Sequence, residues 1–348
     1  MRPRVWLSRT RDAAINLALE DSLLRTSQTP QCVLYVNMPC VVVGRNQNAW
    51  GELDARAMRA EGVALVRRHS GGGTVYHDHG NLNFSFHTQK DGFVRRTHAD
   101  LVARALAGNP IRLPWRHGLP PVFVNERNDL CVYERGMSPS KDAERKVSGS
   151  AYRMAMRRAY HHGTLLLDAQ IDRMRLLRRR SSSTIESRAV ESVRSPVANL
   201  AQVFPHHSDR LTPEAVAFAI RREFERVYGQ CDVHEFDERA LLDGAIEERY
   251  NTLQTWDWIF GGAPEFSVRA SGDSRMGRID VHVTCKHGRV AHIDARGVPE
   301  IVTAAQHLIG LPYDALVPAP PSAAPTPGIP PPTSPADQTL RAWIHDNL

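Results

Sequence analysis

The chain has 348 residues, of which 42% are apolar and 24% charged, a balance typical of a globular protein with a buried core. Its length predicts about two domains, and no stretch approaches the ~18 consecutive apolar residues of a membrane-spanning helix. Five scattered cysteines without CxxC spacing argue against a disulfide scaffold or a structural zinc site. The net charge of +6 permits an acidic partner.

The N-terminus allows two interpretations. The first eleven residues carry four arginines and no acid, which is typical of an organelle presequence. We favour the alternative, a first strand over Val5–Ser8 with flanking charges. If a presequence exists, most of it is missing from this chain.

The first half of the chain predicts strands and helices in a mixed order. Asp12 is a suitable N-cap for a helix over Ala13–Leu24, whose apolar residues recur at helical spacing. Two β-rich runs around an Asn-Met-Pro turn predict a hairpin of Cys32–Val36 with Cys40–Val43. Further predicted elements are a helix over Glu52–Glu61, strands over Val63–Val66 and Leu82–His87, a helix over Ala99–Ala107 and a strand over Asn128–Val132.

A glycine-rich loop stands out at residues 67–85, RRHSGGGTVYHDHGNLNFS. Three consecutive glycines are costly to order and are tolerated where a backbone must approach something closely. Beside Arg67 and Arg68, that something is an anion. The alternative is a plain hairpin turn with two solvated arginines. Because a strand rather than a helix follows, the loop is neither a P-loop nor a Rossmann fingerprint.

A second dense stretch covers residues 145–167, RKVSGSAYRMAMRRAYHHGTLLL. Lys146 enters a strand beside small residues, so it can point into a pocket as a mobile cation. The alternative is an edge lysine that discourages aggregation. The basic run over Ile171–Arg180, which ends in Arg178–Arg180, predicts a solvated helix face or linker, with contact to an acidic protein as the alternative.

The second half predicts helices followed by a small hairpin-and-helix region. Thr212 and Pro213 are suited to begin a helix over Pro213–Tyr228. The remaining predictions are a helix over Ala240–Arg249, a hairpin of Arg278–Thr284 with Arg289–Ala295, a helix over Pro299–Ile309 and a last helix over Asp337–His345. Residues 312–335 contain ten prolines, so no packed element is expected there.

Taken together, these stretches resemble the lipoate–protein ligase A and lipoyltransferase family. The resemblance runs through RRHSGGGTVYHDHGN, VVVGRNQNAW, RKVSGSAYR with HHGTLLL, ESVRSPVANL and LQTWDWIFGGAPEF, and covers nearly all of residues 5–270. VNERNDL and LYVNMPCVVVGRNQN are most similar to mitochondrial members of fungi and animals. The Pro-rich tail departs from the family pattern.

The resemblance implies an α/β (α+β) fold, with a catalytic domain like class II tRNA synthetases and biotin ligases and a small C-terminal α+β domain. We therefore expect a catalytic lipoate–protein ligase domain over residues 1–250 and an accessory domain over 251–311. A disordered Pro-rich linker over 312–336 and a short helix over 337–348 complete the predicted organisation.

The resemblance also implies a reaction. Lipoate and ATP form lipoyl-adenylate and pyrophosphate, and the acyl group then passes to one lysine of an acceptor protein. Expected acceptors are the lipoyl domains of 2-oxoacid dehydrogenase E2 subunits and the glycine cleavage H protein. Mg²⁺ is expected with ATP, although no carboxylate is clearly dedicated to it, and Asp78 could equally cap the Gly80-Asn81 turn. No protein metal ligand, nucleic acid or membrane is expected, and we expect a monomer in mitochondria, or in the cytoplasm if the source is bacterial.

The family's functional residues carry over onto matching positions. Lys146 would be catalytic, contacting the acyl carbonyl and the phosphate, and Arg68 would sit on the nucleotide. Gly73 and the following residues would wrap the adenylate with backbone groups, while Asn81 and His162 would shape the pocket. The full expected set of binding residues is Arg68, Ser70, Gly71, Gly72, Gly73, Thr74, Val75, Tyr76, Asn81, Lys146 and His162.

Several alternatives stay open. The nearest is a transferase that accepts preformed lipoyl-adenylate or an acyl thioester without the activation step. An octanoyltransferase with a cysteine nucleophile is less favoured, since no cysteine lies between Lys146 and Cys231. A biotin ligase is disfavoured by the absence of its GRGRxxRxW-type loop. A nucleic-acid-binding module would need aromatics interleaved in the motif for base stacking, and an inert scaffold would have degraded site residues.

Overall fold

The computed structural model describes residues 2–115, 118–177, 185–322 and 326–348. Contacts divide the chain into two compact units, each discontinuous in sequence. Unit 1 comprises Met1–Cys40, Arg68–Met174 and Val193–Asn251, and unit 2 comprises Val41–Arg67, Arg175–Ser192 and Thr252–Leu348. The predicted catalytic and accessory domains, over residues 1–250 and 251–311, stay a prediction. Arg178–Arg180 of the predicted basic run, and residues 116–117 and 323–325, lie outside the described residues.

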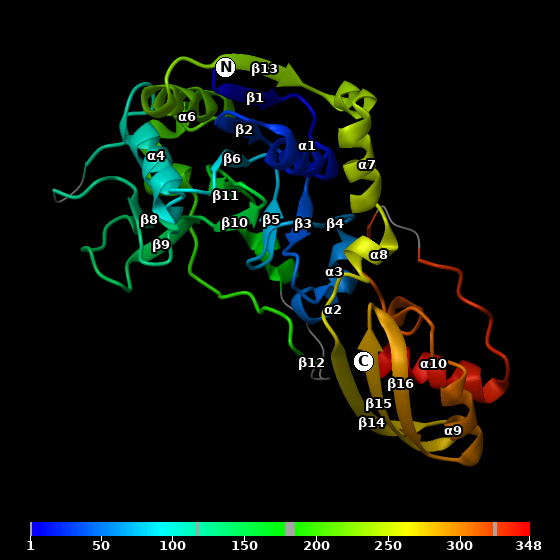
Figure 1. Cartoon of the computed structure of the whole chain (residues 1–348). Helices are drawn as coiled ribbons and strands as arrows, with labels where there is room; N and C mark the ends of the chain where they lie inside the picture. Colours follow the sequence, from blue (N-terminus) through cyan, green and yellow to red (C-terminus); the bar gives the residue numbers. More distant parts are fainter. Residues whose placement is uncertain (1, 116–117, 178–184, 323–325) are drawn as a thin grey trace. The chain divides into compact units, whose positions relative to one another are not determined.

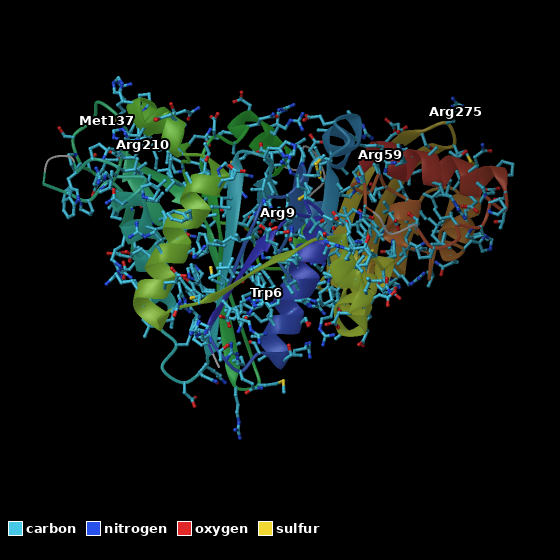
Figure 2. All side chains as sticks on the ribbon, turned by 90° about the horizontal axis from the view of Figure 1, so that it is seen from above. Trp6, Arg9, Arg59, Met137, Arg210 and Arg275 are labelled. Carbon is cyan, nitrogen blue, oxygen red and sulfur yellow. The ribbon has the colours of Figure 1, made fainter. Side chains whose placement is uncertain are left out.

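Unit 1 is built on a six-stranded mixed sheet with the strand order β10-β11-β6-β2-β1-β13 (Figure 1). Its strands are β1 (Arg4–Ser8), β2 (Gln31–Tyr35), β6 (Asn81–Gln89), β10 (Ser150–Ala155), β11 (Arg158–Leu166) and β13 (Asp232–Phe236). β1 runs parallel to β2 and β13, whereas the other neighbours pair antiparallel. Trp6 of β1, labelled in Figure 2, stacks on His234 of β13 with ring centroids 4.9 Å apart.

The central strand β6 has an apolar face and a polar face, and both are buried. Successive side chains of a strand point to opposite faces, so Leu82, Phe84 and Phe86 alternate with polar residues. The apolar residues join the core that contains α4 (Arg95–Ala107) and α6 (Pro213–Tyr228). The polar residues are Asn81, Asn83, Ser85 and His87.

Helix α1 (Ala13–Thr26) accompanies the polar side of this sheet. It contacts β2, β6 and β11. Its Glu20 accepts a hydrogen bond from the Tyr35 hydroxyl of β2 and lies 2.8 Å from the His162 ring of β11. Buried polar groups therefore collect between α1 and the sheet, where each finds a partner instead of water.

A separate three-stranded sheet carries Lys146. Its order is β7 (Phe123–Val124), β8 (Leu130–Tyr133) and β9 (Glu144–Ser148). On the side of β9 away from β8, the Lys146 backbone bonds to Pro196 and Ala198, at 2.8 and 3.1 Å. The short helix α5 (Leu200–Val203) follows. Lys146 therefore does not lie on an open edge, and the edge-lysine alternative is wrong.

Unit 2 contains a four-stranded sheet with the order β12-β14-β15-β16. The strands are β12 (Ile185–Ser187), β14 (Phe266–Ser274), β15 (Gly277–Lys286) and β16 (Arg289–Arg296), and the pairing of β15 with β16 confirms the predicted hairpin. Helix α9 (Pro299–Gln306) contacts β16, and α10 (Pro335–Asn347) contacts both α9 and β14. Unit 2 also includes β4 (Ala64–Arg67) and α8 (Trp256–Ile259), which contact each other.

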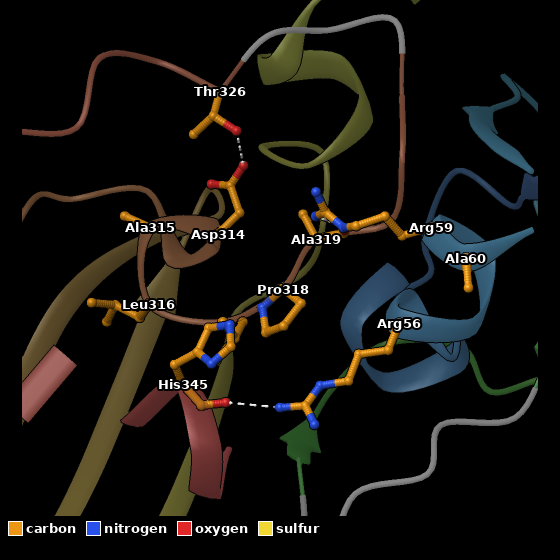
Figure 3. Close-up of a pocket in the computed structure, with 11 residues that line it drawn as sticks. Arg56, Arg59, Ala60, Asp314, Ala315, Leu316, Pro318, Ala319, Thr326 and His345 are labelled. Atoms are coloured by element: carbon orange, nitrogen blue, oxygen red, sulfur yellow. Dashed lines mark hydrogen bonds between the residues drawn. The ribbon is translucent and has the colours of Figure 1, made fainter. Parts of the chain in front are cut away.

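Residues 312–322 of the Pro-rich stretch pack within unit 2, whereas residues 328–333 are exposed. The sequence predicts a disordered linker over the whole stretch. The carbonyl of Pro321 accepts from the Leu65 amide at 2.6 Å, and that of Ala319 accepts from Arg59 of α3 (Ala55–Ala60) at 2.7 Å. Figure 3 shows Arg56 reaching the carbonyl of His345 in the same way, beside a cavity of about 720 Å³. Proline lacks an N–H but keeps its carbonyl, so an extended Pro-rich chain can still accept hydrogen bonds.

Three predicted elements differ from the structure. β2 pairs with β1 and β6, so the predicted hairpin with β3 (Cys40–Val43) does not form. Buried Asn37 bonds to Asn16 and His77 at this point, which fixes the turn where the chain leaves β2. The helix predicted over Glu52–Glu61 is split into α2 (Ala49–Glu52) and α3, because the Asp54 side chain caps Ala57. A 3-10 helix (Glu238–Leu242) and α7 (Gly244–Leu253) replace the helix predicted over Ala240–Arg249.

The other predicted helices and strands are confirmed with small shifts in their ends. Within the described ranges, none of the helices has the length and apolar character needed to cross a membrane.

Buried histidines of unit 1 predict a sensitivity to acid. Burial lowers the pKa of His77 and His87 to about 3 and that of His98 to about 4, from an ordinary value of 6.5. The folded protein keeps these rings neutral while the unfolded chain protonates them. Their contribution to stability is therefore present above the unfolded pKa of 6.5 and is lost as the pH falls toward 4 for His98 and toward 3 for His77 and His87.

Between about pH 8 and about pH 5.5, the three rings together should lower the free energy of unfolding by about 4 kcal/mol. Urea unfolding at a series of pH values measures this. His98→Gln should reduce the loss by about 1.4 kcal/mol, whereas His206→Gln, at an exposed position, should leave it unchanged. An equal loss in the His98 variant and the wild type would contradict the assignment.

Candidate active site

The glycine-rich loop folds around the side chain of Arg68. The guanidinium is buried, with 3% exposure. Its Nε donates to Ser70 Oγ at 2.9 Å, and its Nη2 donates to the carbonyls of Gly71 and Gly73 at 2.6 and 2.7 Å. Burial lowers the Arg68 pKa to about 10. Arg68 therefore binds the inner side of its own loop, and its predicted contact with a nucleotide stays a prediction.

Ser70 continues into a chain of buried polar groups. Its Oγ lies 2.7 Å from His162 Nε2, and His162 Nδ1 lies 2.8 Å from Glu20 Oε2. The Tyr35 hydroxyl donates to the other Glu20 oxygen at 2.9 Å. Burial acts to raise the Glu20 pKa, but His162 and Tyr35 hold it below its ordinary value. The loop is thus connected to α1 by a continuous path through β11.

The order serine, histidine, carboxylate resembles a nucleophile with its base and orienting acid. Ser70 has only 1% exposure, however, and its oxygen also accepts from Arg68. An acyl carbon has no access to such an oxygen. The hydrogen-bonded series of Ser70, His162 and Glu20 therefore supports the loop and is not a nucleophilic site.

The loop and Lys146 meet on the same short segment, residues 149–151. A Cβ atom placed on Gly72 would lie 3.5 Å from Ala151. One placed on Gly149 would lie 3.3 Å from Lys146 Cε and 3.4 Å from its Nζ. A side chain at Gly149 would therefore crowd the end of the Lys146 side chain.

Lys146 is paired with Asp129. Its Nζ lies 3.0 Å from Asp129 Oδ1, and the lysine side chain keeps 22% exposure. Asp129 is nearly buried at the start of β8, next to Asn128, which adopts a positive φ of 62°. A cation that is partly exposed and held by one carboxylate can exchange that partner for a substrate anion.

The Gly-Asn turn after β5 (Val75–His77) serves the fold. Asp78 accepts from the amides of Gly80 and Gln170 at 2.9 and 2.8 Å, so both its oxygens are used, as the turn-cap alternative predicts. Asn81 donates to Asn83 and accepts from the Leu165 amide. Thr74 and Val75 are partly exposed, and Tyr76 is buried in β5. Asn81 is predicted to shape the pocket. Its side chain binds β6 and β11 rather than the loop.

Sequence reasoning does not identify four nearby acidic or phenolic groups, which are Glu20, Asp21, Tyr35 and Asp129. The available signal is an adjacent Glu-Asp pair inside the otherwise apolar helix Ala13–Leu24, where a charge needs a partner. The sequence predicts an anion beside Arg67. In the structure its side chain is buried in unit 2 and donates to the carbonyls of Gly44, Gln47 and Ile259.

The Asp21 carboxylate forms ion pairs with three arginines. Arg25 and Arg249 lie 2.9 and 3.1 Å from its carboxylate, and Arg153 is also bonded to it. His69 of the loop stands 3.9 Å away. Burial acts to raise the Asp21 pKa, and His69 and Arg153 keep it low. One carboxylate therefore ties α1 to β10, α7 and the loop.

A metal ion finds no prepared site in this part of the chain. Among the described residues, no three His, Cys, Asp or Glu side chains are grouped closely enough to hold one. Asp78 is committed to its turn. The expected Mg²⁺ stays a prediction.

Comparisons with known proteins point to one family. The family model described as "Lipoyl protein ligase A/B catalytic domain" matches residues 12–225. The lipoate-protein ligase A of Bdellovibrio bacteriovorus is 33% identical over 291 residues, which span 82% of this chain and 80% of that protein.

Two solved structures have a similar fold. P. falciparum LipL1 in complex with lipoate has a TM-score of 0.61 at 22% identity, covering 89% of this chain and 90% of that one. A lipoate-protein ligase A bound with ATP has a TM-score of 0.56 at 23% identity, covering 74% and 98%. The α+β fold class is confirmed, while the relation to class II synthetases and biotin ligases stays a prediction.

The turn at Gly80 predicts a sharp difference between two glycines. A Cβ atom at Gly80 would lie 2.0 Å from the Asp168 carbonyl oxygen, whereas at Gly71 it would meet nothing within 4 Å. Gly80→Ala should lower the free energy of unfolding by about 3 kcal/mol. Gly71→Ala should leave it unchanged or raise it by up to about 1 kcal/mol, because alanine restricts the unfolded chain. Urea unfolding measures both, and equal stabilities of the two variants would contradict this packing.

Proposed function

The chain belongs to the lipoate–protein ligase family of enzymes, and we propose that it activates lipoate with ATP and transfers the lipoyl group to a protein lysine. The acid would become lipoyl-adenylate with release of pyrophosphate. The acceptor amine would then displace AMP. One observation carries the proposal, namely that the glycine loop and Lys146 pack on the same segment, residues 149–151.

The first step brings two anions together. A carboxylate oxygen of lipoate attacks the α-phosphorus of ATP, and the bond to the pyrophosphate oxygen breaks. Mutual repulsion opposes this approach, so a fixed cation between the anions lowers the barrier. Lys146 is suited to the task because it is held in place by an anionic partner, Asp129, at 3.0 Å and is still partly exposed.

The second step needs the same cation in a different role. The acceptor amine attacks the acyl carbonyl, an oxyanion forms, and its collapse expels AMP while the amine loses its proton. A donor placed at the oxyanion is worth about 3–4 kcal/mol in such transition states. The loop N–H groups suit the phosphate of the adenylate because their dipoles are fixed and bring no counter-charge.

The nearest alternative is a transferase that begins from preformed lipoyl-adenylate or an acyl thioester. It uses the same loop and the same lysine for the second step, so both reactions are compatible with this site.

For the acceptor we propose lipoyl domains of 2-oxoacid dehydrogenase E2 subunits and the glycine cleavage H protein. The net charge of +6 supports an acidic partner, since opposite charges speed encounter. A monomer, a mitochondrial location and a Mg²⁺ ion carried by the nucleotide belong to the same proposal.

The proposal predicts lipoate-dependent exchange of labelled pyrophosphate into ATP. Lys146→Ala should reduce this exchange by at least about 100-fold, because the cation that offsets the repulsion is gone. Circular dichroism checks that the variant folds. Lys141→Ala is the matched control, since this lysine is exposed and pairs with Glu144 at 3.1 Å on the adjacent loop.

The outcomes separate the two reactions. Exchange by the wild type that survives in Lys146→Ala would refute the role of the lysine. Absence of exchange, together with transfer from added lipoyl-adenylate to a lipoyl domain, would favour the transferase.

A further inference from the structure

We propose that Arg68 binds the adenylate phosphate indirectly, by turning the Gly72 N–H outward, and that Glu20 fixes Arg68 through a one-way hydrogen-bond chain. The inference rests on the proposed function for the identity of the anion. It makes Arg68, Ser70, His162 and Glu20 positioning residues, which act on the substrate through the backbone of the loop.

The geometry of the peptide bond sets the direction of the Gly72 N–H. In a planar trans peptide the C=O of one residue and the N–H of the next point in opposite directions. The Gly71 carbonyl points at Arg68 Nη2, 2.6 Å away, so the Gly72 N–H must point away from Arg68. The same holds for the Gly73 carbonyl and the Thr74 N–H. Two amides separated by one residue thus point away from a single guanidinium.

Gly72 fits this use. It is exposed and has a φ of +85°, a conformation that residues with a side chain rarely adopt. A Cβ atom at this position would also lie 3.2 Å from Arg68 Nη2. Successive N–H groups in a loop that contains a left-handed residue form a concave anion site. The positive charge of Arg68 stands behind the site and adds to its potential.

The hydrogen bonds from Arg68 to Glu20 run in one direction. A Glu20 carboxylate can only accept, so the proton of a neutral His162 ring lies on Nδ1. Ser70 Oγ accepts from Arg68 Nε and gives its own proton to His162 Nε2. His162 Nε2 is then an acceptor, and the proton on Nδ1 faces Glu20 Oε2 at 2.8 Å. Tyr35 donates to the second oxygen of Glu20. A cation at one end and a carboxylate at the other leave one arrangement of protons and one tautomer of His162.

Burying both charges, Glu20 and Arg68, costs free energy. Glu20 and Arg68 have 1% and 3% exposure, and two charges buried this deeply are expensive unless every donor and acceptor between them is matched. An apolar α1 would be simpler to pack against the sheet. The buried pair of Arg68 and Glu20 is explained if it holds the loop in one conformation. Lysine could not replace Arg68, because the three acceptors require the fixed fork of a guanidinium.

The test compares Glu20→Gln with Glu20→Ala in the full chain. The carboxamide of glutamine keeps an oxygen for His162 Nδ1–H, whereas alanine removes the end of the chain. Nitrogen-15 NMR of labelled histidine reads the His162 tautomer, and the Gly72 amide signal is followed while AMP is added. Ser85→Ala is the control, because it removes a different buried Ser–His contact of 3.0 Å, to His87.

We expect the wild type to hold His162 with its proton on Nδ1 and to shift the Gly72 amide signal when AMP binds. Glu20→Gln and Ser85→Ala should keep both properties. Glu20→Ala should lose the single tautomer and the AMP-induced shift, and its rate of adenylate formation should fall about 10- to 100-fold. If Glu20→Ala does not fold, Ser70→Ala interrupts the chain elsewhere and should likewise abolish the Gly72 response.

A proton on His162 Nε2 in the wild type would overturn the proposal, as would a normal Gly72 response in Glu20→Ala or Ser70→Ala. These readouts require no turnover. A wild type that binds AMP correctly but forms no adenylate would refute the activation step of the proposed function and leave this inference standing. A protein that does not bind AMP would refute the nucleotide site. The tautomer of His162 would still show whether the hydrogen-bond chain from Arg68 to Glu20 exists.

Discussion

The burial of one arginine is the constraint on which this site depends. A guanidinium with 3% exposure must satisfy its donors inside the protein, and Arg68 does so with carbonyls of the loop that follows it and with Ser70. Three adjacent glycines would otherwise be the least ordered part of the chain. The Arg68 guanidinium therefore orders the loop before any ligand binds. The loop then presents a rigid surface of backbone amides.

The sheet supports this arrangement because its central strands have two different buried faces. Phe84 and Phe86 of β6 join the apolar core, while His87 on the same strand faces the polar groups near Glu20. On β11, His161 contacts the ring of Phe84, whereas its neighbour His162 bonds to Ser70. A shift of one residue in either strand would exchange these faces. The register of the sheet thus decides which histidine supports the loop.

Sequence patterns and family resemblance predict the α+β class, most elements and the two dense stretches. They do not predict what Arg68 touches, because an arginine beside glycines is compatible with a ligand or with carbonyls of its own loop. They also miss Glu20 and Asp129, whose partners His162 and Lys146 lie far away in sequence. The hairpin of β2 with β3 is wrong because turn composition cannot reveal that Asn37 is held by Asn16 and His77. The discontinuous units have no local signal at all.

The central claim is that the loop binds the adenylate with its backbone while Arg68 stays behind it. A crystal structure with a non-hydrolysable lipoyl-adenylate analogue measures this directly. We expect phosphate oxygens within hydrogen-bond distance of the Gly72 nitrogen, with Arg68 Nη2 still on the carbonyls of Gly71 and Gly73. A guanidinium that has left the loop carbonyls and contacts the phosphate itself would contradict it.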